Sequence, residues 1–119
     1  MILNKNIAGN STISVSTVRE TKFICTKEIV RLQASGNYTR IFIKNKPPMI
    51  ISKSLKVFDG ILKPAGFLRT QQSHLINPRY VRSVSRHQEI QMDDGAVAGI
   101  SRRKRRAVLS LLKDGTLRD

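Results

Sequence analysis

Short β-prone runs, each closed by turn-forming residues, make up most of this 119-residue sequence. Residues 38–43 read Tyr-Thr-Arg-Ile-Phe-Ile, and aromatic and β-branched residues of this kind favour a strand. A Ser-Gly-Asn turn precedes this run, and Pro47 and Pro48 follow it, where proline cannot donate a ladder hydrogen bond. The same pattern predicts strands over 13–18, 22–26, 29–34, 38–43, 49–52, 67–71, 74–76, 80–84, 89–92 and 96–100. The chain is therefore predicted to be mainly β.

Two segments change to helical spacing. The first is predicted over residues 54–63, with Ser52 or Ser54 as its cap and Pro64 and a glycine after it. Its apolar positions are Leu55, Phe58, Ile61 and Leu62. The second is predicted to begin after Ser101 and to end at the following Asp-Gly pair. Its apolar stripe is Ala107, Val108, Leu111 and Leu112.

Length and composition fit one globular domain, with 39% hydrophobic and 25% charged residues. We expect residues 1–20 to be an N-terminal tail, loose up to residue 9, that can contribute a first strand from Ile13. Residues 21–113 would then form the domain, and residues 114–119 a C-terminal tail. The residues expected in the core include Phe23, Cys25, Phe42, Phe58 and Phe67.

The charge balance narrows the class of partner. Lys and Arg number 22 against 8 Asp and Glu, which gives a net charge of +14 and a pI near 11.0. An excess of this size carries self-repulsion that a polyanion offsets, so DNA, RNA or an anionic membrane surface are the candidates. Two stretches without acids, Arg31 to Lys56 and Lys63 to Arg86, supply most of the positive field. Membrane insertion is not expected, because no apolar run approaches the ~20 residues of a spanning helix.

The densest basic run is Arg-Arg-Lys-Arg-Arg at residues 102–106, at the predicted start of the last helix. Cations at a helix N-terminus are disfavoured by ~0.3–1 kcal/mol each. Because cations at this position bring no evident structural gain, the run indicates a function. The total charge favours contact with phosphates as that function.

Catalysis, metal binding and cofactor binding are not indicated. His74 and His87 have no evident nucleophile or carboxylate partner, no Cys/His cluster has metal spacing, and no glycine-rich phosphate loop is present. Cys25 is the single cysteine, so an internal disulfide is excluded. With no secretory signal in residues 1–16, a reducing cytoplasm is the expected location.

Four motifs resemble the LytTR family of bacterial DNA-binding output domains. Residues 32–41 (LQASGNYTRI) are similar to the family's EA-x-GNYT turn, and residues 52–56 to its entry into the mid-domain helix. Residues 67–77 (FLRTQQSHLIN) parallel the family's FFRVHRSYLVN segment. The Asp-Gly pair at residues 94–95, followed by residues 100–104 (ISRRK), parallels the family's DG…IPVSRR segment. The motifs occur in the family order between Ile24 and about Leu112, and together they are far more specific than any one of them.

The resemblance implies an elongated stack of small antiparallel sheets whose loops, rather than a recognition helix, enter successive major grooves. The base contacts that it implies are Thr39, Arg40, Arg69, Gln71, Gln72 and Arg102. The phosphate contacts are Lys53, Ser73, Arg103 and Lys104. Arg and Gln suit base reading, because they can bind guanine and adenine bidentately. Paired direct repeats bound by two protomers, and a separate sensor or regulatory protein as a further partner, are also implied.

Three positions depart from the family pattern: Gln71 replaces its usual His, His74 its Tyr, and Gly99 its frequent Pro. We therefore expect a different sequence preference. The alternative reading is an RNA-binding or ribosome-associated basic β module. Proteins that bind single-stranded RNA stack its bases on exposed aromatic side chains, and only 5% of the residues in this chain are aromatic. Duplex DNA is accordingly the favoured partner.

Overall fold

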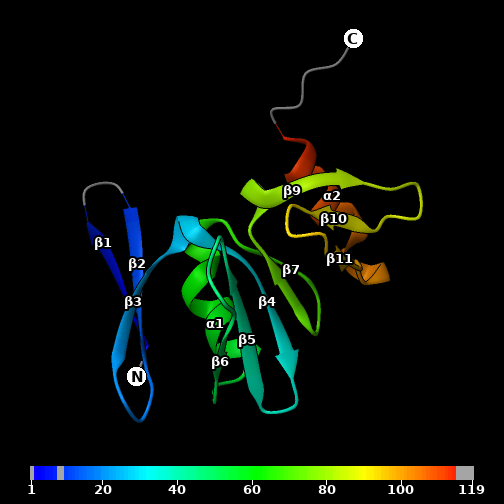
Figure 1. Cartoon of the computed structure of the whole chain (residues 1–119). Coiled ribbons are helices and arrows are strands. Elements are labelled where there is room, and N and C mark those ends of the chain that lie inside the picture. The colour runs from blue at the N-terminus through cyan, green and yellow to red at the C-terminus, as the bar shows by residue number, and fades with distance from the viewer. Residues whose placement is uncertain (1, 8–9, 115–119) are drawn as a thin grey trace.

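Three antiparallel sheets follow one another along the molecule in the computed structural model, which describes residues 2–7 and 10–114 (Figure 1). Sheet A has the order β1-β2-β3, sheet B the order β6-β5-β4-β8-β7, and sheet C the order β11-β10-β9. Their bounds are β1 Ile2–Ile7, β2 Asn10–Ser16, β3 Thr21–Cys25, β4 Ile29–Ser35, β5 Tyr38–Ile43, β6 Met49–Ile51, β7 Leu68–Gln71, β8 His74–Ile76, β9 Val81–Val84, β10 Ile90–Met92 and β11 Val97–Ala98. The extents of 49 × 35 × 24 Å make the molecule elongated, as predicted.

Two short α-helices complete the architecture: α1 (Leu55–Leu62) lies between β6 and β7 in the chain, and α2 (Arg105–Lys113) follows sheet C. Single 3₁₀ turns connect these elements: η1 (Thr26–Glu28) lies between β3 and β4, η2 (Lys63–Ala65) between α1 and β7, η3 (Pro78–Tyr80) between β8 and β9, and η4 (Arg102–Lys104) between β11 and α2. The mid-chain helix was predicted correctly. The C-terminal helix begins later than predicted, because η4 takes up the first part of the basic run.

Sheet B lies between two hydrophobic clusters. One face packs with sheet A and α1, through residues that include Ile13, Leu32, Phe58, Leu62 and Leu75. The other face packs with sheet C and α2, through Val30, Ile76, Tyr80, Ile90, Met92, Ala98, Ile100 and Val108. Central strand β4 is therefore buried on both faces over its first half, which fixes the position of its second half.

Several sequence-based expectations about the core were wrong. Phe23 is 66% exposed, because its neighbour Ile24 occupies the inward face of β3 opposite Ile13. Cys25 is half-buried rather than buried. The strand predicted over 13–18 ends at Ser16, and Val18 after it is fully exposed. Phe42 is half-buried rather than part of either cluster, whereas Phe58 and Phe67 are buried as predicted. In α2 the inward residues are Val108, Leu109 and Leu112, while Ala107 and Leu111 are exposed.

The N-terminal segment also differs from the expected loose tail. Residues 2–7 form β1 and pair with β2 from Ile2 opposite Val15 to Ile7 opposite Asn10. Residues 1, 8 and 9 of that predicted tail, and residues 115–119 of the predicted C-terminal tail, lie outside the described residues. Backbone pairing with β2 thus forms a strand that the polar, Asn-rich composition did not indicate.

Candidate nucleic-acid interface

One end of sheet B gathers the turns that the sequence singled out. The β4–β5 turn, the β7–β8 turn and the residues that follow β6 all lie at this end, because the strands are antiparallel and in register. Gly36 takes a φ of +61° in the β4–β5 turn, a conformation that costs glycine little. Figure 1 shows both hairpin turns at the lower end of the sheet.

Backbone hydrogen bonds connect these turns to one another and to η4. The Ala34 N–H donates to the Ser73 carbonyl at 2.9 Å, which joins the two hairpins. The Ser101 N–H donates to the Thr70 carbonyl at 2.8 Å, which attaches the start of η4 to β7. The predicted contact segments, far apart in sequence, therefore form one continuous surface.

A row of polar side chains crosses four strands of sheet B on this surface. Arg40 on β5 lies opposite Gln33 on β4, Gln33 lies opposite His74 on β8, and His74 lies opposite Gln71 on β7. Since neighbouring strands lie about 4.8 Å apart, the backbones at the two ends of the row are roughly 14 Å apart. The row brings the predicted base readers Arg40 and Gln71 together, and it adds Gln33, which the sequence analysis did not select.

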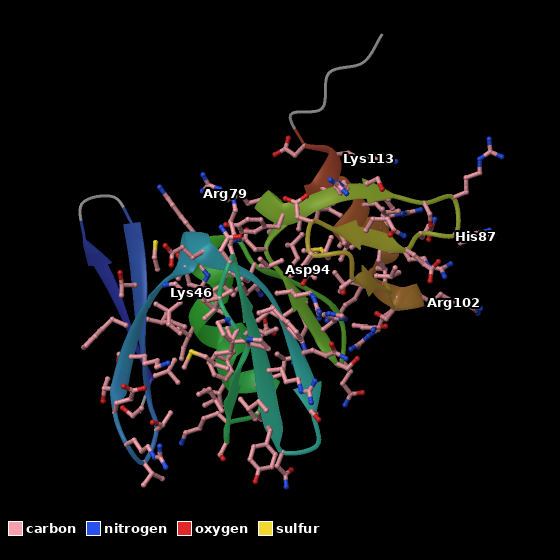
Figure 2. All side chains as sticks on the ribbon, in the orientation of Figure 1. Lys46, Arg79, His87, Asp94, Arg102 and Lys113 are labelled. Atoms are coloured by element: carbon pink, nitrogen blue, oxygen red, sulfur yellow. The ribbon has the colours of Figure 1, made fainter. Side chains whose placement is uncertain are left out.

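Buried Arg31 links this row to sheet C. Its Nε donates to Asp94 Oδ2 at 2.8 Å, and its Nη1 lies 3.0 Å from Gln33 Oε1 and 3.2 Å from His74 Nε2. The guanidinium also stacks 3.6 Å from the centroid of the Phe42 ring. Asp94 lies between sheets B and C (Figure 2). Arg31 had been counted as part of the free positive field, but its charge is paired within the fold.

His74 is held neutral in this network. The pKa of His74 is lowered from 6.5 to about 4, chiefly by burial and next by the Arg31 charge, while Asp94 opposes the shift. Because a guanidinium can only donate, His74 Nε2 must accept from Arg31 and the ring proton must be on Nδ1. His74 thus has a structural role.

Thr39 does not have the exposure of a base contact. It is fully buried, and its hydroxyl donates to the Lys53 carbonyl at 2.7 Å. Neighbouring strand residues point to opposite faces, so Thr39 points inward where Arg40 points outward. Thr39 therefore positions the backbone at Lys53, whose side chain is exposed.

The Thr39 hydrogen bond gives a direct stability prediction. Thr39→Val keeps the shape of the side chain but loses this bond, and we expect the free energy of unfolding to fall by about 1 kcal/mol in urea denaturation. Thr70→Val is the matched control, because Thr70 is equally buried and its Oγ1 has no partner among the described residues. The control should be neutral or stabilising, and an equal loss in both variants would contradict the role given to Thr39.

Arg69 and Lys104 are partly engaged within the protein. Arg69 Nη2 donates to the Gln72 carbonyl at 2.8 Å, and its Nη1 lies 3.8 Å from Asp59. Lys104 Nζ donates to the Arg69 carbonyl at 3.1 Å. Desolvation, then the neighbouring Arg69, lowers the Lys104 pKa. Both side chains hold η4 and the β7–β8 turn in place. Their placement fits a role in positioning these segments better than the base contact expected of Arg69 or the phosphate contact expected of Lys104.

The remaining predicted contacts are available at the surface. Gln72, Ser73, Arg102 and Arg103 are exposed, as are Arg40 and Lys53, and Arg102 points away from the body of the molecule (Figure 2). Gln71 is half-buried, and its Nε2 lies 3.4 Å from Ser73 Oγ. Tyr38 is 50% exposed beside the β4–β5 turn.

A family model of the LytTr DNA-binding domain matches residues 19–113. The chain belongs to this LytTr family. The resemblance that its motifs suggested is thereby confirmed. A family defined by DNA binding, rather than by catalysis, supports the conclusion that the chain binds DNA.

A solved structure has the same fold. It is the LytTr DNA-binding domain of a protein described as a methyl-accepting/DNA response regulator from Bacillus cereus. The two chains superpose with a TM-score of 0.71 at 17% identity, over 85% of this chain and 95% of the other. The predicted LytTR-like stack of small antiparallel sheets with two short helices is confirmed. No curated protein matches the chain significantly.

None of the described helices is long and apolar enough to cross a membrane. Within the described part of the chain, no group of three or more His, Cys, Asp or Glu side chains is placed to hold a metal ion.

Proposed function

We propose that this LytTr domain is a sequence-specific, cytoplasmic regulator of bacterial transcription that reads successive major grooves of duplex DNA. The observation that carries the proposal is the continuous surface formed by the β4–β5 turn, the β7–β8 turn and η4. Its backbone hydrogen bonds link segments that lie far apart in sequence, and the segments carry basic and amide side chains. Paired direct repeats occupied by two protomers, and a separate regulatory protein as partner, belong to the same proposal.

The proposed base contacts and the proposed phosphate contacts occupy different parts of the surface. Arg40 and Gln71 at the ends of the row, with Gln72 and Arg102, are the proposed base readers. Exposed Lys53, Ser73 and Arg103 surround them and are the proposed phosphate contacts. Phosphate contacts set the register of a protein on DNA, whereas base contacts set the sequence. Lys104 supports the surface by holding the Arg69 carbonyl.

The neighbouring exposed arginines of η4 provide a matched test of this division. Arg102→Ala is expected to weaken binding to the preferred sequence by about 1–3 kcal/mol, and to change binding to a scrambled duplex much less. Arg103→Ala should weaken both duplexes equally and reduce the salt slope by about 1. Fluorescence anisotropy on the two duplexes at several salt concentrations measures both effects. An equal loss on both duplexes for Arg102→Ala would remove this residue from the base readers.

The shortage of exposed aromatic residues on the proposed surface favours duplex DNA over single-stranded RNA as the partner. Phe23 and Tyr38 are exposed, but Phe23 lies on sheet A, away from the surface that carries the basic and amide groups. A single-strand reader needs several stacking platforms beside its basic groups. The proposed surface offers only Tyr38 for this purpose among the described residues.

A further inference from the structure

We propose that a groove between β9 and α2 binds an acidic segment of a regulatory partner protein, and that this segment carries large apolar side chains. The inference goes beyond DNA binding, and it rests on the proposed function only for the existence of a partner. The groove has a volume of about 650 Å³, within the roughly 300–1,000 Å³ typical of ligand sites. Its walls come from η3, from β9 and from the second half of α2.

The floor of the groove is aliphatic. Four of its side chains pack against the hydrophobic cluster that joins sheets B and C but stay only partly buried: Val81, Val84, Leu109 and Leu112. Leu111 lines the same groove, is 58% exposed and belongs to neither hydrophobic cluster. Contact of this aliphatic surface with water is unfavourable, so a partner that covers it gains free energy. The floor therefore favours a protein segment over a nucleic-acid phosphate backbone.

The rim of the groove is basic. Arg79 and Lys113 are exposed and form no ion pair within the described part of the chain. Arg82 lies 3.8 Å from Asp93, but both side chains are more than half exposed, so this pair contributes little. Asp114 is the one acid among the described residues that line the groove. The rim therefore has an excess of positive charge that acidic side chains of a partner would complement.

The groove is remote from the proposed DNA surface. In Figure 1, β9 and the C-terminal end of α2 lie at the upper end of the molecule, and the β4–β5 and β7–β8 turns lie at the lower end. Arg79 and Lys113 lie well above Arg102 of η4 in Figure 2. A helix rises 1.5 Å per residue, so α2 places Lys113 roughly 12 Å from η4. A partner can therefore occupy the groove while the chain is bound to DNA.

Other occupants fit this groove less well. A second copy of the chain would be repelled, because each copy carries a net charge of +14. A lipid bilayer is flat, whereas the aliphatic floor lies in a concave groove. A separate acidic protein meets both conditions, since its apolar side chains fill the floor and its carboxylates pair with the rim.

The test is selection of peptides from a random phage-displayed library by the full chain, once free and once with excess duplex DNA to cover the DNA surface. We expect the peptides selected in both arms to combine Asp or Glu with large apolar residues. In fluorescence anisotropy, Leu111→Gln should weaken their binding about 10-fold, since a half-exposed leucine loses its burial. Arg79→Glu should weaken binding more at low salt than at high salt. Val97→Gln and Arg86→Glu, exposed residues outside the groove, are the matched controls and should change nothing.

Several outcomes would overturn the inference: no shared pattern among the peptides, peptides without acids, displacement of every peptide by duplex DNA, or unchanged binding to Leu111→Gln. Binding only after removal of residues 115–119, or a dimer that Leu111→Gln dissociates, would show that the chain itself fills the groove. Equal duplex affinity of Leu111→Gln and wild type confirms that the variant is folded. If the chain enriches no DNA motif, only the proposed function fails, because the peptide test does not depend on sequence-specific DNA binding.

Discussion

Arg31→Ala is expected to lower the free energy of unfolding by about 3–5 kcal/mol, the largest effect of any single replacement in the polar network. The Arg31 side chain is 10% exposed and pairs with Asp94 at 2.8 Å. Its removal leaves the partly buried Asp94 carboxylate without its cationic partner and takes the Arg31 donor from His74 Nε2 and Gln33 Oε1. Because Asp94 lies in the turn between β10 and β11, the contact between sheets B and C is weakened as well.

Urea denaturation of Arg31→Ala, followed by circular dichroism, measures this loss. The total stability of a domain is typically about 5–15 kcal/mol, so the variant should still fold at low urea concentrations. Arg40→Ala is the matched control, since Arg40 lies on the same sheet but is exposed and forms no ion pair within the described part of the chain. Its change should stay within about 0.5 kcal/mol. Equal stabilities of the two variants would contradict the structural role of Arg31.

The second large effect is a pH dependence that originates at His74. Its pKa is about 4 in the folded protein, where burial is the main cause, against 6.5 in the unfolded chain. Between these values the unfolded state binds more protons, so stability rises with pH. The contribution is complete above pH 6.5 and is lost as the pH falls towards 4. At 1.36 kcal/mol per pKa unit, the loss amounts to roughly 3 kcal/mol.

Urea denaturation at intervals from pH 7 to pH 4 separates His74 from the other titrating groups when the wild type is compared with His74→Gln. A glutamine oxygen can accept from Arg31 but does not titrate. We expect the stability of His74→Gln to fall less steeply in this window than that of the wild type. Parallel curves for the two proteins would show that His74 titrates normally and is not held neutral by the fold.

The sequence predicted the elements better than their faces. Periodicity and turn residues located β5 and α1 closely, because both signals are local. The exposed side of β3 could not be read in this way, since Phe23 and Ile24 are both apolar and alternate between opposite faces. Pairing with Ile13 on β2 decides that Ile24 points inward, and this contact depends on the register between strands. The pairing of β1 with β2 is hidden in the sequence for the same reason.

The sequence located the segments of the candidate site. The roles of individual side chains within those segments followed only from their contacts in the structure. Alternation along β5 could have placed Thr39 and Arg40 on opposite faces from sequence alone. In contrast, nothing local indicates that Arg31 is neutralised by Asp94, 63 residues later in the chain. Gln33 was missed because its place beside Arg40 and His74 exists only once three strands are paired in register.

Selection of the chain on a random duplex pool at two salt concentrations tests the central claim most directly. We predict enrichment of a repeated motif, together with binding that weakens steeply as salt rises, because phosphate contacts release counterions. Enrichment requires base contacts, which charge alone cannot provide. Binding that depends on salt but enriches no sequence would contradict the claim, and it would make the basic RNA-binding reading the better account.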